Sequence, residues 1–128
     1  IIVISSGGCG LPFYIDEKND FRPAEAVIDK DLASALMGGL IKADEFYILT
    51  DVPYVYINYK KPNEMKIEHL SHADTMKYMN DGMFGEGNMA PKIRACLTFI
   101  ENGGKKSVIT EATKLEDRSY GTKITMEY

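Results

Sequence analysis

The chain has 128 residues, of which 45% are apolar, and this is enough to bury the core of one ordinary domain. Its net charge of -4 and its isoelectric point near 5.2 argue against the broad positive face that nucleic-acid-binding proteins present. No apolar run approaches the roughly 20 residues that a membrane-spanning helix needs, so we expect a cytoplasmic protein without a nucleic-acid or membrane partner. Cys9 and Cys96 have no metal ligand at short spacing, which predicts two reduced thiols.

The first four residues, Ile1–Ile4, form an apolar run rich in β-branched side chains, which predicts a buried strand. Because this strand would already be under way at the first residue, we expect the chain to be a segment of a longer protein. A processed N-terminus is the alternative. The glycine-rich residues 5–10 would follow the carboxyl end of the strand, where open parallel sheets bind ligands. They fit either an ordinary turn or a backbone cradle for a ligand.

The first helix is predicted to begin near Lys30. Residues 11–25 before it hold two prolines and mixed charge, which indicates a loop or a short hairpin. Apolar side chains then recur at helical spacing across residues 32–40. Lys30 therefore lies at a helix start, between Asp29 and Asp31. These carboxylates either neutralise the lysine at the surface or orient it toward a ligand.

A second buried strand is predicted at residues 46–49. The glycine pair Gly38-Gly39 before it is expected to weaken the first helix or to end it early. The strand would deliver Thr50 and Asp51 to the ligand-binding edge of the sheet. The alternating residues 54–59 predict a short strand, whose tyrosines fit either half-buried packing or contact with a planar ligand.

The second half of the chain continues the alternation of helices and strands. Residues 71–74 have the pattern of a capping box and predict a helix start, while the two histidines nearby are expected at the surface. Residues 80–86 are expected to be a flexible connection. Two more strands are predicted at residues 107–110 and 121–126. This alternation predicts a layered α/β fold with a mainly parallel sheet.

The strongest functional signal is the stretch Gly87-Asn88-Met89-Ala90-Pro91-Lys92, which puts a glycine turn, a proline and a lysine at a helix start. The helix itself is predicted from the spacing of the apolar residues Ile93, Cys96, Leu97 and Ile100. A lysine in the first helical turn costs about 0.3 to 1 kcal/mol unless a negative group binds there. Lys92 therefore either points into water or, paired with Lys30 at the other helix start, holds a phosphate. Neither segment is a Walker loop.

In order and spacing, these segments resemble the carbamate kinases of the amino acid kinase superfamily over nearly the whole chain. The pattern Gly-x-Met-x-Pro-Lys is shared widely in the superfamily, whereas Val-Ile-Asp-Lys-Asp-Leu-Ala and Tyr-Val-Tyr-Ile-Asn are closer to carbamate kinases. Three residues depart from the family pattern, namely Cys9, Asn88 and Ala90. The matching segments are Ile2–Gly8, Ala26–Ala33, Ile48–Val52, Tyr54–Tyr59, Gly87–Lys92 and Gly121-Thr122.

The resemblance implies a three-layer α/β/α sandwich around a mainly parallel open sheet. Residues 1–128 would form its C-terminal, nucleotide-binding part, with the N-terminal carbamate-binding half absent. The implied reaction is reversible phosphoryl transfer between ATP and carbamate, giving ADP and carbamoyl phosphate, in arginine breakdown. Mg²⁺ would be bound largely through the phosphates, and the full-length parent would be a homodimer. The segment alone is expected to be inactive, because a phosphoryl-transfer site must hold both substrates in line.

The resemblance also assigns site residues. Lys30 and Lys92 would flank the transferring phosphoryl group, with Asp31 and also Asp29 holding Lys30 in place. No residue is assigned as a metal ligand. Another family member acting on N-acetylglutamate or glutamate, or a non-catalytic nucleotide-binding fragment, remains an alternative. The nucleotide would lie along Asp29, Thr50, Asp51, Tyr54, Tyr56, Gly87, Met89 and Pro91, and the phosphate and carbamate end would face Gly7, Gly8 and Gly10.

Overall fold

The computed structural model describes residues 1–4, 11–84 and 89–127, and the expected α/β class is confirmed. Strands β5 and β6 are additions that the sequence pattern did not predict, and strand β4 is shorter than expected. The elements are β1 Phe13–Ile15, β2 Phe21–Pro23, α1 Lys30–Leu40, β3 Glu45–Thr50, β4 Val55–Ile57, β5 Met65–Ile67, β6 His69–Ser71, α2 His72–Asn80, α3 Met89–Glu101, β7 Lys106–Glu111, the 3-10 helix η1 Ala112–Lys114, and β8 Thr122–Thr125.

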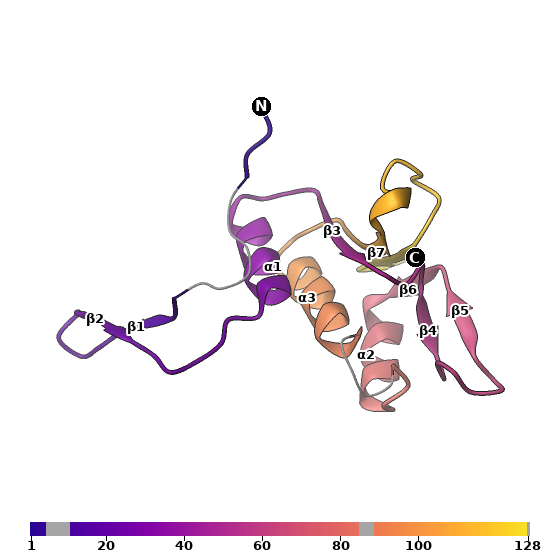
Figure 1. Ribbon diagram of the computed structural model, residues 1–128, viewed down its shortest axis with the longest axis horizontal. Helices are drawn as coiled ribbons and strands as arrows, with labels where there is room; N and C mark the ends of the chain where they lie inside the picture. The colour runs from indigo at the N-terminus through magenta and orange to yellow at the C-terminus, as the bar shows by residue number, and fades with distance from the viewer. Residues whose placement is uncertain (5–10, 85–88, 128) are drawn as a thin grey trace.

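A four-stranded sheet in the order β3-β7-β8-β6 forms the centre of the fold (Figure 1). Strands β3 and β7 pair in parallel, as do β6 and β8, whereas β7 and β8 are antiparallel. The expected mainly parallel sheet is therefore confirmed, with one antiparallel pairing at its centre. Strands β4 and β5 form a separate hairpin beside it.

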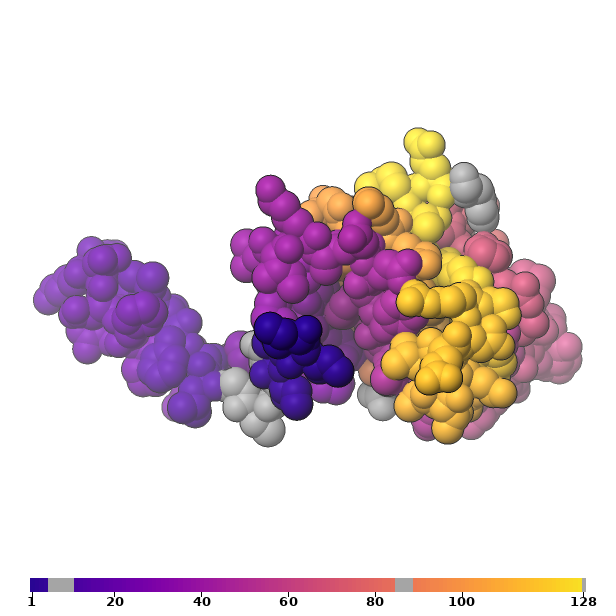
Figure 2. All heavy atoms as spheres, turned by 90° about the horizontal axis from the view of Figure 1, so that it is seen from above, coloured from indigo at the N-terminus to yellow at the C-terminus, as the bar shows by residue number. Residues whose placement is uncertain are grey.

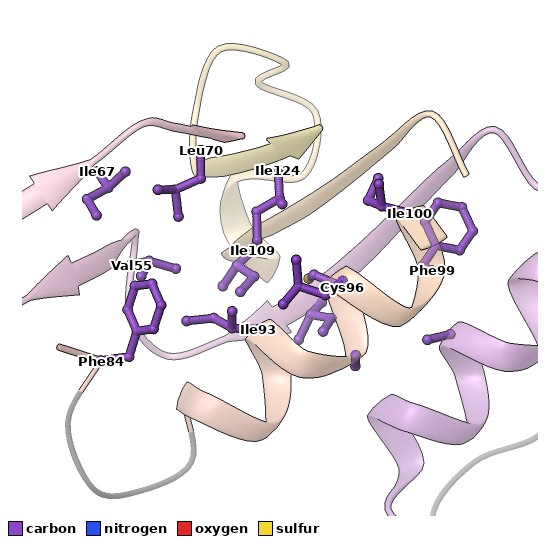
Figure 3. Close-up of a cluster of buried hydrophobic side chains, with 14 of the residues drawn as sticks. Val55, Ile67, Leu70, Phe84, Ile93, Cys96, Phe99, Ile100, Ile109 and Ile124 are labelled. Carbon is purple, nitrogen blue, oxygen red and sulfur yellow. The ribbon is translucent and has the colours of Figure 1, made fainter. Parts of the chain in front are cut away.

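Helix α3 packs against this sheet with α1 beside it, and the core lies between α3 and the strands (Figure 3). Helix α2 packs against α3 and β6. All four apolar residues that predicted α3 are buried, and they meet Ile48, Ile109 and Ile124 from the sheet. Each fully buried large aliphatic side chain contributes about 1.5 to 3 kcal/mol relative to an exposed one. Helix α3 is therefore the central element of the core, and it also carries Lys92.

Phe99 of α3 is enclosed by two glycines, which lets α1 and α3 approach each other. A Cβ atom built on Gly38 would lie 3.0 Å from the Phe99 ring, and one built on Gly104 would overlap that ring. The Phe46 ring completes the enclosure, with its centroid 5.3 Å from that of Phe99. Helix α1 continues through Gly38-Gly39 to Leu40, and the missing side chain at Gly38 makes room for Phe99.

Gly104→Ala is expected to lower the free energy of unfolding by about 1 to 3 kcal/mol, the usual cost of overpacking a core. Phe99 is fully buried and cannot rotate away from the added methyl group. Urea denaturation measures the change. In a Phe99→Leu background the same substitution should cost clearly less, and equal costs in both backgrounds would contradict the proposed overlap.

Helix α2 begins as predicted and is tied to α3. The Ser71 hydroxyl accepts a hydrogen bond from the Asp74 N–H at 3.1 Å and donates one to the Asp74 carboxylate at 2.7 Å. His72 Nε2 lies 2.8 Å from Glu101 Oε1, which joins the start of α2 to the end of α3. In the connection expected at residues 80–86, Asn80 ends α2 and Phe84 is 5% exposed because its ring packs into the core, while residues 85 and 86 lie outside the described residues.

The N-terminal part of the described chain extends away from the core. Ile1–Ile4 is not a strand, and its side chains are at least 77% exposed, so the prediction of a buried strand is wrong. A strand needs a neighbour along its edge, and no described strand pairs with this segment. The hairpin predicted in residues 11–25 does form, as β1 and β2, and it projects as an arm from the body (Figures 1 and 2).

The sheet face opposite the helices is crossed by residues 112–121, which we call the strap. Arg118 of the strap donates hydrogen bonds to Glu45 Oε2 and to the Tyr47 hydroxyl, both at 2.7 Å. Lys106 forms a further ion pair with Glu45 at 2.7 Å. Hydrogen bonds from Lys106 first and from the Tyr47 hydroxyl next, with the positive charges of Lys106 and Arg118, lower the pKa of Glu45 from its ordinary 4.5 to about 2.

Glu45 is expected to make the fold sensitive to acid. Because its folded-state pKa is depressed, its contribution is fully present above pH 4.5 and is lost as the pH falls toward about 2. The side chain is 34% exposed, so solvent screening keeps the loss small. Glu45→Gln should give a shallower fall of the urea midpoint between pH 4.5 and 2.5 than the wild type. Parallel curves for the two proteins would contradict this role.

Candidate functional site

One edge of the sheet collects the ends of several elements. Strands β3 and β7 are parallel, so Thr50 and Glu111 at their carboxyl ends lie at the same edge. Strand β8 is antiparallel to β7 and begins there with Thr122. Helices α1 and α3 each precede one of the parallel strands and run back against it, which brings Lys30 and Lys92 to this edge as well. We call it the site edge.

Asp29 caps helix α1 at the site edge. Its carboxylate accepts hydrogen bonds from the N–H groups of Asp31 at 2.8 Å and Leu32 at 3.1 Å. The Leu32 N–H is the main cause of the lowered pKa of Asp29, and Lys30 and Lys92 lower it further. Asp29 therefore fixes the start of α1, and this sets the directions in which the side chains of Lys30 and Asp31 project.

Asp31 holds both lysines. Its Oδ2 accepts a hydrogen bond from Lys92 Nζ at 2.9 Å, and its Oδ1 lies 3.4 Å from Lys30 Nζ. The side chains of Asp31 and Lys92 are each only 13% exposed, whereas that of Lys30 is 59% exposed. The structure therefore extends the expected role of Asp31, which contacts Lys92 more closely than Lys30.

Lys92 lies in the first turn of α3, as predicted, but it does not point into water. No acidic residue stands in that first turn, so the negative charge that offsets Lys92 comes from Asp31 on the neighbouring helix. A phosphate is thus not needed to relieve the charge conflict at the helix start. It would instead meet two ammonium groups that one carboxylate already holds in place, together with the N-terminal end of α3.

Cys96 lies one turn further along α3 and is fully buried, as expected for a thiol in the core. Burial raises the pKa of this thiol to about 12. The Ser107 hydroxyl donates a hydrogen bond to the Cys96 carbonyl at 3.1 Å, which ties α3 to β7. Cys96 is therefore a packing residue beside the site and not a nucleophile.

The tyrosines predicted to line a ligand form a second group, around the β4–β5 hairpin. The ring centroids of Tyr54 and Tyr120 are 5.0 Å apart, and those of Tyr56 and Tyr59 are 5.6 Å apart. Burial is the main cause of the raised pKa of Tyr56. Among the described residues, no hydrogen bond, ion pair or ring contact joins this group to Asp31 and the lysines.

Gly121-Thr122 anchors the tyrosine group to the sheet. The Thr122 hydroxyl accepts a hydrogen bond from the Val55 N–H at 2.8 Å and donates one to the Ile67 carbonyl at 2.5 Å. Gly121 has a φ of +88°, and a Cβ there would lie 2.6 Å from the Ile109 carbonyl oxygen. Only glycine fits this turn. The turn places the Thr122 hydroxyl where it can bond both strands of the hairpin, β4 and β5.

The other residues predicted to bind the ligand lie at the end of β3, at the start of α3, or outside the described residues. Thr50 donates a hydrogen bond to Asp51 at 3.1 Å where β3 ends. Met89 begins α3 and packs against the core, and Pro91 lies exposed in the first turn. The predicted glycines Gly7, Gly8, Gly10 and Gly87 lie outside the described residues, as do Cys9 and Asn88.

Two contacts at the site edge were not predicted. Lys92 and Asp31 are 61 positions apart, and no local pattern reveals their pairing. Tyr120 was passed over, although it directly precedes the Gly121-Thr122 pair that the sequence did single out. Its hydroxyl donates a hydrogen bond to Glu111 at 3.0 Å.

Comparison with known proteins connects this geometry to a family. The profile of the amino acid kinase family matches residues 1–111. The chain belongs to the amino acid kinase family. Among similar members, a carbamate kinase of Trichomonas vaginalis is 44% identical over 110 residues, which cover 85% of this chain and 35% of that protein. Carbamate kinase 2 of Staphylococcus aureus is 43% identical over 125 residues, covering 97% of this chain and 40% of its own length.

Solved structures of similar proteins have the same fold. The carbamate kinase from Giardia lamblia bound to AMP-PNP is 38% identical with a TM-score of 0.84, covering 91% of this chain and 41% of that one. An N-acetylglutamate synthase from Neisseria gonorrhoeae, at 18% identity and a TM-score of 0.59, shows likeness of fold alone. This family member therefore spans about two-fifths of the length of the carbamate kinases it matches.

No helix among the described residues is long and apolar enough to cross a bilayer. No cluster of three or more histidine, cysteine, aspartate or glutamate side chains there is arranged to hold a metal ion. Asp29 and Asp31, the carboxylates beside Lys92, are already engaged by helix N–H groups and by the lysines.

Proposed function

We propose that this chain is the nucleotide-binding part of a carbamate kinase, which transfers a phosphoryl group reversibly between ATP and carbamate. The single observation that carries the proposal is the Asp31 carboxylate holding Lys30 and Lys92 at two helix starts. Support comes also from the carbamate kinases that match the chain at 43% and 44% identity. The products of the forward reaction would be ADP and carbamoyl phosphate, and a cytoplasmic role in arginine breakdown fits this chemistry.

The chemistry follows from the charges at the site edge. Transfer of a γ-phosphoryl group spreads negative charge over its oxygens, and catalysis consists mainly of positioning and of positive charge near them. Lys92 is held rigidly by Asp31, so its ammonium group needs no reorganisation when charge develops. Lys30, which is more exposed, can follow the phosphate as it moves. Asp29 fixes the helix from which both Lys30 and Asp31 project.

The nucleotide would extend from the lysines toward the tyrosine group along the site edge. Thr50, the last residue of β3, and Asp51 after it would lie along the ribose, with Tyr54 and Tyr56 near the base. Met89 and Pro91, with Gly87, would border the phosphates at the start of α3. Gly7, Gly8 and Gly10 would face the phosphate and carbamate end. Magnesium would enter as part of the substrate MgATP, because it prefers phosphate oxygens and water as ligands.

A phosphoryl-transfer site must hold both substrates in line, and this chain carries residues suited to the nucleotide. The chain covers two-fifths of its relatives, so we propose that a preceding half binds carbamate and completes the enzyme, as a homodimer. The exposed apolar side chains of Leu36, Leu40 and Ile41 along and after α1 support a further packing partner.

Two measurements test the proposal. Calorimetry of the chain with MgATP should detect binding, and the chain alone should show no turnover. A coupled ADP-release assay of the complete protein should show activity with carbamate. Activity with glutamate or N-acetylglutamate and none with carbamate would reject carbamate as the acceptor. Nucleotide binding without turnover in the complete protein would instead favour a non-catalytic nucleotide-binding role.

A further inference from the structure

The strap, residues 112–121, is fastened to the main sheet at two points, Arg118 and Tyr120. Arg118 reaches Glu45 and the Tyr47 hydroxyl on the face of the sheet away from the helices. At the site edge the Tyr120 hydroxyl donates a hydrogen bond to Glu111, the last residue of β7. The strap therefore leaves the site edge, crosses the back of the sheet and returns to the same edge at Gly121 (Figure 1).

At the site edge, side chains from three segments form a row. The Lys114 ammonium lies 5.6 Å from the centroid of the Tyr120 ring, and the Lys66 ammonium lies 4.6 Å from that of the Tyr54 ring. Between the lysines, the two rings are in contact, with centroids 5.0 Å apart and planes tilted by 49°. Aromatic pairs in this geometry attract each other, and an ammonium group over a ring adds to the attraction.

Tyr54 depends on this row for its position. It lies in the connection between β3 and β4, where no regular element fixes its ring. The backbone beside it is held by the hydrogen bond from the Val55 N–H to Thr122, while the ring is held by Tyr120. The hydrogen bond to Glu111 in turn fixes the Tyr120 ring relative to β7. The strap thus connects the main sheet to the ring of Tyr54.

We propose that Tyr120 is a positioning residue that holds Tyr54 at the base end of the nucleotide site, so that the strap sets affinity for the nucleoside portion of the ligand. The inference rests on the proposed function. It assigns recognition of the phosphates and recognition of the nucleoside to different residues along the site edge. Lys30 and Lys92 would act on the phosphates, whereas Tyr120 would act through Tyr54 on the nucleoside.

The test compares ATP with inorganic tripolyphosphate, which has the phosphates and lacks the nucleoside. Tyr120→Ala should weaken MgATP binding by about three- to ten-fold, the range for loss of one aromatic contact, and leave tripolyphosphate binding unchanged. Tyr120→Leu keeps apolar bulk without the ring. It should likewise weaken MgATP binding and leave tripolyphosphate binding unchanged, and it provides the test if the alanine variant does not fold. Tyr120→Phe, which loses only the hydroxyl, should lie between wild type and alanine.

A matched control is Tyr14→Ala on the arm, where the tyrosine is 55% exposed, and it should bind both ligands like the wild type. Equal weakening of ATP and tripolyphosphate by the Tyr120 variants would indicate a merely structural role and overturn the inference. Unchanged ATP affinity would overturn it as well. If the wild-type chain bound neither ligand, the proposed function would fail together with the inference.

Discussion

Replacing Lys92 with alanine is expected to lower the turnover of the complete enzyme by about 10² to 10³, the usual loss when a group that stabilises transition-state charge is removed. Lys92 has the properties that such a group needs, because its side chain is only 13% exposed and Asp31 holds its ammonium group at 2.9 Å. The loss should appear mainly in kcat, since the charge on the phosphoryl group grows as the reaction proceeds. A coupled ADP-release assay with carbamate measures it.

Lys105 provides the matched control for Lys92. It lies just beyond the other end of α3, away from the site edge, and pairs with Asp44 in an exposed contact at 2.7 Å. Lys105→Ala should leave turnover unchanged, which separates a site effect from a general effect of removing charge around this helix. Wild-type turnover in Lys92→Ala would reject the assignment of this lysine to catalysis.

Asp31→Ala is expected to destabilise the chain even without a ligand, by about 2 to 4 kcal/mol, somewhat less than the cost of breaking a fully buried ion pair. The substitution leaves the Lys92 ammonium unpaired in a largely buried position at a helix start, where the helix dipole is also unfavourable. Urea denaturation of the isolated chain measures the loss. The same variant should lose the alignment of both lysines and with it most nucleotide binding.

A double substitution separates the lost charge pair from other effects of removing Asp31. Asp31→Ala with Lys92→Met leaves only the exposed Lys30 without its partner and no largely buried charge, so it should be more stable than Asp31→Ala alone. Asp44→Ala is the matched control, because Asp44 is 71% exposed in its pair with Lys105 and should show no measurable change. If Asp31→Ala and the double variant were equally stable, the Asp31–Lys92 pair would contribute nothing.

Sequence spacing predicted elements well where the signal is local. The apolar spacing from Ile93 to Ile100 predicted α3 and its buried face, and the Ser71–Asp74 pattern predicted a helix start. Both signals arise within one or two turns of helix, so they do not depend on the rest of the fold. The same is true of Lys30 and Lys92, whose places in the first turns of α1 and α3 could be read from the residues around them.

Predictions that depended on distant parts of the chain were incomplete. The pairing of Asp31 with Lys92 joins residues 61 positions apart and arises from the packing of α1 against α3. Gly38-Gly39 was expected to weaken the first helix or to end it early, because the position of Phe99 cannot be read from local spacing. Ile1–Ile4 has the composition of a buried strand, but composition does not supply the neighbouring strand that burial requires.

The projecting arm bears on how this chain behaves at high concentration. Strands β1 and β2 pair only with each other among the described strands, so each keeps an outer edge of unpaired backbone groups. Phe13, Ile15 and Phe21 on these strands are each more than half exposed. A two-stranded ribbon of this kind is a template on which another chain can add a strand. Self-association through the arm would therefore involve a sheet separate from the one that carries the site edge, and early aggregates could retain an intact site edge.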